Sequence, residues 1–139
     1  MAAISLVIWN NAVYSNQIYY KLHLQQEASQ SMITKILYEI EHLEGYEYGT
    51  TPVAFVGRFT GSDYFASPEY FNEVIVYGTA QTPFTYPNTV KSYLKYYLNN
   101  KMNVIDVNSE DEIIKQMPCY PERGSIALID GVVVVKISE

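Results

Sequence analysis

The residues best placed for ligand chemistry follow a short apolar run in the first half of the chain. This run ends in the segment Gly57-Arg-Phe-Thr-Gly-Ser-Asp63. Ligands of open α/β sheets bind at the carboxyl ends of strands. We therefore treat Gly57, Arg58 and Asp63 as candidate contacts for a nucleotide or another small ligand. The segment matches neither Gly-x-Gly-x-x-Gly nor a phosphate loop, so a plain strand-to-helix loop is the alternative.

An acidic residue closes the next expected strand. Asp106 lies at the end of that strand, where it is expected to approach the loop that carries Asp63. Two carboxylates brought together in this way suit acid–base chemistry on a sugar, or metal chemistry. Capping and turn roles explain both residues equally well, so both interpretations stay open.

The segment Pro118-Cys-Tyr-Pro-Glu-Arg-Gly124 is the second unusual stretch. Its prolines restrict φ, and its glycine permits an unusual return of the chain. It is either a stiff connector or a cleft edge that presents Tyr120 and Arg123 to a sugar or a peptide. No histidine lies near Cys119 in the sequence, so we expect a structural thiol and not a nucleophile.

The sequence contains no complete catalytic or metal-binding set. His23 and His42 lie too far apart on one expected helix to share a site, and a metal needs three or four converging ligands. We therefore expect no catalytic residue, no metal and no cofactor. The net charge of −6 offers no basic footprint, which argues against nucleic acid as a partner.

Helices alternate with strands along the chain. Apolar residues recur at helical spacing from Ile33 to Leu43, which predicts a long helix over about 10–43, in one or two pieces. The other expected elements are a strand at 53–57, a short helix or irregular segment from 67, a helix at 88–98, a strand at 102–107 and a helix at 110–117. Asn108 and Ser109 are expected to cap the last of these helices.

The end of the chain predicts a β-hairpin. Two apolar runs, Ile126–Ile129 and Val132–Ile137, are joined by Asp130-Gly131. Asp-Gly between such runs favours a type I′ turn, because that turn needs positive φ at both central residues. Together with the alternating helices, the hairpin predicts an α/β fold. We expect a single domain with a small mixed sheet, mostly parallel with a C-terminal antiparallel hairpin, flanked by helices.

The first nine residues are apolar but short. A transmembrane helix takes about 20 apolar residues, and the basic region of a signal peptide is missing. Residues 1–9 are interpreted either as the start of a buried helix or as the end of a preceding transmembrane helix. The single α/β domain then covers residues 10–139.

Four blocks of sequence, taken in order and spacing, resemble a known family. The blocks are Ile40-Glu-His-Leu-Glu-Gly-Tyr46; Pro52-Val-Ala-Phe-Val-Gly57; Tyr93-Leu-Lys-Tyr-Tyr-Leu98 with Asn103-Val-Ile-Asp106; and Met117-Pro-Cys-Tyr-Pro121 with Gly124-Ser-Ile126 and Asp130-Gly-Val-Val-Val-Val-Lys136. They are similar to the C-terminal soluble domain of bacterial glucosyltransferase II-type proteins, which are polytopic membrane enzymes that modify O-antigen. The similarity runs from about Asn10 to Ser138.

The resemblance implies a role in glucosyl transfer. The whole protein would carry transmembrane helices before Met1 and transfer glucose from a polyprenyl-phosphate donor to a cell-surface glycan. Family catalysis is expected in acidic loops that this chain lacks, so no catalytic residue carries over. The chain would be an accessory domain at the extracytoplasmic face of the cell membrane, with the glycan or the rest of the enzyme as partner. A soluble nucleotide- or small-ligand-binding module is the alternative.

Overall fold

The computed structural model describes residues 2–58 and 87–138. In chain order its elements are α1 (Ala2–Glu41), β1 (Val53–Val56), α2 (Pro87–Tyr96), α3 (Glu112–Gln116), β2 (Ile126–Ile129) and β3 (Val132–Lys136). The loop residue Asp63 and the short helix expected from residue 67 lie outside the described residues.

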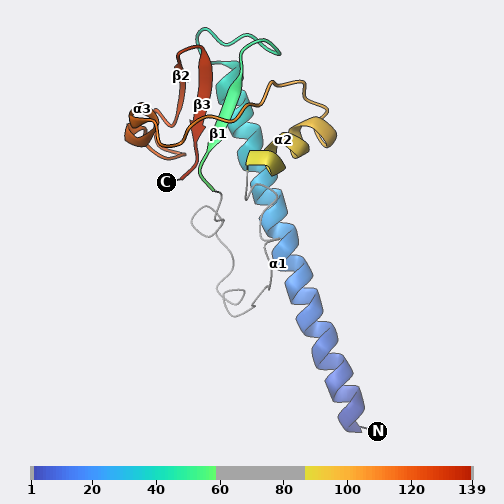
Figure 1. Ribbon diagram of the computed structural model, residues 1–139. Coiled ribbons are helices and arrows are strands. Elements are labelled where there is room, and N and C mark those ends of the chain that lie inside the picture. Colours follow the sequence, from blue (N-terminus) through green and yellow to red (C-terminus); the bar gives the residue numbers. More distant parts are fainter. Residues whose placement is uncertain (1, 59–86, 139) are drawn as a thin grey trace.

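Helix α1 is the longest element, and its N-terminal part projects away from the sheet (Figure 1). Its 40 residues give a rod about 60 Å long at 1.5 Å per residue. The expected long helix is confirmed in one piece, and it begins at Ala2, so residues 2–9 continue it. Only the C-terminal part has a buried apolar face, which includes Ile33, Ile36 and Ile40.

The three strands form one mixed sheet in the order β1-β3-β2. β1 pairs parallel with β3, and β2 pairs antiparallel with β3. Asp130 and Gly131 both have positive φ, at 48° and 81°, as a type I′ turn requires. The small mixed sheet and its C-terminal antiparallel hairpin are therefore confirmed.

Helices cover both faces of this sheet. Val133 and Val135 of β3 pack in the main core with α1 and α2, whereas Val134 points to the other face and packs with Ile114 of α3. Alternate residues of a strand face opposite sides. Both faces of β3 are therefore buried under helices, which explains why its sequence is an unbroken apolar run instead of an alternating one.

The expected strand at 102–107 is wrong in extent. Only one parallel bridge forms, between Val53 and Val104. The Val53 amide donates to the carbonyl of Asn103 at 2.8 Å, and the Ile105 amide donates to the carbonyl of Val53 at 2.9 Å. The chain then leaves the edge of β1 and turns towards α3, so the ladder cannot extend.

Helix α3 is also shorter than the expected helix at 110–117. Its N-cap is Asp111, whose carboxylate accepts from the Ile113 amide at 2.9 Å. Asn108 accepts from the Glu110 amide instead, which forms the preceding turn. The expected cap at Asn108 and Ser109 is therefore wrong, because two local side-chain acceptors compete and the one nearer the helix caps it.

Candidate functional site

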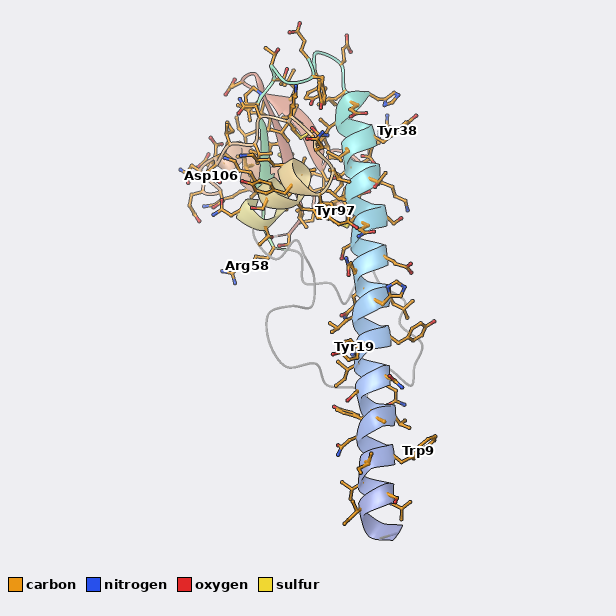
Figure 2. The ribbon with its side chains drawn as sticks, turned by 90° about the vertical axis from the view of Figure 1, so that its right-hand side faces the viewer. Trp9, Tyr19, Tyr38, Arg58, Tyr97 and Asp106 are labelled. Carbon is orange, nitrogen blue, oxygen red and sulfur yellow. The ribbon has the colours of Figure 1, made fainter. Side chains whose placement is uncertain are left out.

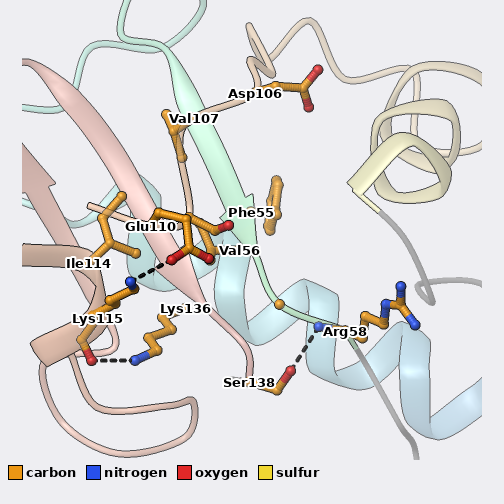
Figure 3. Close-up of a pocket in the computed structure, with 12 residues that line it drawn as sticks. Phe55, Val56, Arg58, Asp106, Val107, Glu110, Ile114, Lys115, Lys136 and Ser138 are labelled. Atoms are coloured by element: carbon orange, nitrogen blue, oxygen red, sulfur yellow. Dashed lines mark hydrogen bonds and ion pairs between the residues drawn. The ribbon is translucent and has the colours of Figure 1, made fainter. Parts of the chain in front are cut away.

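A cleft of about 670 Å³ opens at the carboxyl end of β1, between that strand and α3 (Figure 3). Its apolar wall is formed by Phe55, Val56, Val107 and Ile114. Its polar lining comprises Gly57, Arg58, Asp106, Ser109, Glu110, Lys115, Lys136 and Ser138. The volume falls in the range of small-molecule sites, roughly 300–1,000 Å³.

The structure brings together three of the residues singled out in the sequence. Gly57, Arg58 and Asp106 all line this cleft. The position of these three residues agrees with the general tendency of ligand sites in open α/β sheets to form at the carboxyl ends of strands. Asp63 lies outside the described residues, so its pairing with Asp106 stays a prediction.

Tyr120 and Arg123 do not line the cleft. Tyr120 is buried in the main core, at 6% exposure, and its amide donates to the carbonyl of Lys136 at 2.8 Å. Arg123 is exposed on the following turn. The structure thus gives the 118–124 segment the geometry of a connector anchored by Tyr120, and not that of a cleft edge presenting it.

Gly57 fixes the rim of the cleft. Its φ is +92°, and a Cβ built on it would lie 2.5 Å from the backbone nitrogen of Ser138. The next amide, that of Arg58, donates to the Ser138 hydroxyl at 2.8 Å. This close approach of two backbones ties the end of β1 to the residues after β3, and it sets where Arg58 leaves the sheet.

Lys136 is the buried charge of the cleft, and sequence reasoning missed it. Its side chain is 5% exposed. Its Nζ donates to the carbonyls of Lys115 and Met117, at 2.8 and 2.9 Å, at the C-terminal end of α3. The sequence pattern that could have indicated this buried lysine is its position directly after four valines. In the structure, Lys136 pairs with Val56 of β1. Lysine is almost never fully buried without a partner.

Two of the residues that line the cleft, Glu110 and Lys115, form an ion pair. Lys115 Nζ lies 2.5 Å from Glu110 Oε2. The hydrogen bond from Lys115, and then its positive charge, lowers the pKa of the Glu110 carboxyl. A lowered pKa favours the folded state above the ordinary carboxyl range, and this contribution is lost as the pH falls through the lowered pKa. Both side chains are largely exposed, so the contribution is small.

The remaining reactive side chains of the described part of the chain stay apart. His23 pairs with Glu27 of its own helix at 3.4 Å. The Nδ1 of His42 lies 2.8 Å from the Tyr38 carbonyl oxygen. Within residues 2–58 and 87–138 no three His, Cys, Asp or Glu residues cluster as metal ligands would.

The free end of α1 is the second feature that bears on function. The exposed fractions of its large apolar side chains are Ile4 66%, Leu6 68%, Val7 60%, Ile8 64% and Trp9 71%. Successive residues are rotated by about 100° around a helix, so these five point in every direction and form no single stripe. Figure 2 shows Trp9 near the end of α1 that lies far from the sheet.

Charge is distributed unevenly along α1. No acidic or basic residue occurs from Ala2 to Tyr20; the first is Lys21, and all fifteen acidic residues lie at Glu27 or beyond. No helix of the described residues is both long and apolar enough to cross a bilayer.

Comparisons with protein-family models, curated proteins and solved structures found no match for the chain.

Proposed function

We propose that this chain is an extracytoplasmic accessory domain of a membrane glucosyltransferase. The whole enzyme would transfer glucose from a polyprenyl-phosphate donor to a cell-surface glycan, and the domain would hold the acceptor or the rest of the enzyme without itself being catalytic. The four sequence blocks support the family. The single structural observation that carries the membrane role is the charge-free, exposed apolar end of α1.

A bilayer suits this end of α1 better than a partner helix does. A helix that packs on one protein partner needs one apolar stripe, whereas the five exposed apolar residues between Ile4 and Trp9 are spread around the helix. Residues 2–9 extend about 12 Å, which fits within one leaflet of a hydrocarbon core about 30 Å thick. Trp9 ends this segment and Tyr14 follows it, and aromatic residues of this kind gather at membrane–water interfaces.

The rod geometry also reduces the electrostatic cost of membrane attachment. A chain with net charge −6 is repelled by anionic lipids. The core packing of α1 begins near Ser29 and Met32, and Met32 is about 18 Å along the helix from Tyr20. This distance is about twice the Debye length at physiological salt, so most of the repulsion is screened.

Glucosyl transfer should require the membrane region of the enzyme and not this domain alone. We expect the purified chain to transfer no labelled glucose from polyprenyl-phosphate-glucose to cell-surface glycan, because the resemblance places catalysis in acidic loops of the membrane region that this chain lacks. We also expect the reading frame upstream of Met1 to encode several apolar segments.

Either result could contradict the proposal. Turnover by the purified chain would show that the domain is catalytic. A coding sequence with no apolar segments upstream would remove the link to a polytopic membrane enzyme.

A further inference from the structure

The Lys136 ammonium is a buried cation that lacks an acidic partner in the described part of the chain. Within residues 2–58 and 87–138, ion pairs join His23 to Glu27 and Lys115 to Glu110, and none involves Lys136. Its two bonds go to neutral carbonyls. An ammonium has three donors, so one N–H remains beyond these two bonds. A buried ion without an opposite charge is costly, and an anion in the cleft would reduce that cost.

The described lining of the cleft is opposite in sign to the chain as a whole. Among the described residues, three basic side chains line it, namely Arg58, Lys115 and Lys136, against two acidic ones, Asp106 and Glu110. The described lining therefore carries a net charge of +1, on a chain of −6. Because Glu110 is already paired with Lys115, Asp106 is the acid that opposes an incoming anion.

The shape of the cleft indicates that the anion is organic. A volume of about 670 Å³ is far larger than an inorganic ion needs. Figure 3 shows Ile114 and Val107 on the α3 side with Lys115 and Lys136, while Arg58 and Asp106 lie on the other side. An apolar group would contact the wall formed by Val56, Val107 and Ile114, with its charge directed towards Lys136.

We propose that this cleft binds a small organic molecule that carries a phosphate or carboxylate group, with Lys136 as the principal cation. The shared chemistry is an oxyanion on an apolar body. This site is independent of the membrane attachment of α1, because none of its lining residues belongs to that helix. If Lys136 serves only to cap α3, the cleft will show no preference for anions.

Titration of the labelled full chain tests the proposal directly. Phenyl phosphate and benzoate serve as anionic probes and benzyl alcohol as the neutral probe, and binding is followed by ¹H–¹⁵N NMR. We expect saturable shifts at amides around the cleft, such as those of Arg58, Val107 and Lys115, with the anions only. The anion that binds more tightly identifies the group. Shifts that do not saturate, or that benzyl alcohol reproduces, would overturn the proposal.

Variants separate binding from a structural role of the lysine. Lys136→Met should weaken anion binding roughly tenfold or more, whereas Lys101→Met, at an exposed lysine outside the cleft, should leave it unchanged. Asp106→Asn should strengthen binding about two- to threefold, because it removes the opposing charge from an exposed position that tolerates change. If the Lys136→Met variant does not fold, the Asp106→Asn variant provides the test. Unchanged or weaker anion binding by Asp106→Asn would contradict an anion site.

Discussion

Replacing Gly57 by alanine is expected to lower the free energy of unfolding by about 3 kcal/mol. A left-handed backbone costs a residue with a Cβ about 1–2 kcal/mol, and Gly57 has a φ of +92°. The added Cβ would also meet the backbone of Ser138, with the Ser138 nitrogen at 2.5 Å. Forcing such a contact costs about 1–3 kcal/mol more. Urea unfolding followed by circular dichroism measures the loss.

Gly49 provides the matched control for this prediction. It also has positive φ, at +76°, but a Cβ built there meets no atom within 4 Å. Gly49→Ala should therefore lower the free energy of unfolding only through the strain of a left-handed backbone, by about 1 kcal/mol. Equal losses in the two variants would show that the backbones at the ends of β1 and β3 do not approach as closely as described. They would also remove the basis for the position of the cleft rim.

Placing aspartate at both Ile4 and Ile8 is expected to weaken binding to phosphatidylcholine vesicles by at least about 100-fold. Burial of each isoleucine in hydrocarbon contributes about 1.5–3 kcal/mol, and a factor of ten corresponds to 1.4 kcal/mol. The introduced carboxylates add a further penalty inside the bilayer. Both side chains are mostly exposed in the structure, so the fold should be unaffected. Co-sedimentation with vesicles measures the partition.

A control pair tests whether the effect belongs to the end of α1. Tyr96 and Ile113 are 78% and 54% exposed, on α2 and α3. Aspartate at these two positions adds the same charge to apolar surface on the folded domain, and it should leave vesicle binding within about twofold, since exposed substitutions far from an interface have small effects. Equal loss in the two pairs would indicate a general effect of charge and contradict insertion through α1.

Local patterns in the sequence predict much of this fold. The hairpin follows from Asp130-Gly131 between two apolar runs, and the packed part of α1 follows from the spacing of Ile33, Ile36 and Ile40. Both signals depend only on neighbours along the chain. The apolar run at 102–107 also predicted a regular element, a strand, from local sequence alone. A strand, however, needs a hydrogen-bonding partner along its whole length. Because the chain turns away towards α3, residues 102–107 form only one bridge, between Val104 and Val53.

The candidate site was only partly accessible to sequence reasoning. Gly57, Arg58 and Asp106 were expected near the carboxyl ends of strands, and they line one cleft. The role of Lys136 depends on the pairing of β3 with β1 and on the position of α3, which are long-range contacts. The membrane role proposed for α1 likewise depends on which part of the helix packs on the sheet, and apolar composition alone does not reveal that.

The emission of Trp9 tests the central claim most directly, because it is the only tryptophan in the chain. Trp9 is 71% exposed in the structure, and it lies in the part of α1 that we propose enters the bilayer. On addition of phosphatidylcholine vesicles the proposal predicts a shift of emission to shorter wavelength, with quenching by lipids brominated on their acyl chains. Emission that remains at the wavelength of tryptophan in water, unquenched by brominated lipid, would contradict attachment of this domain to a membrane through α1.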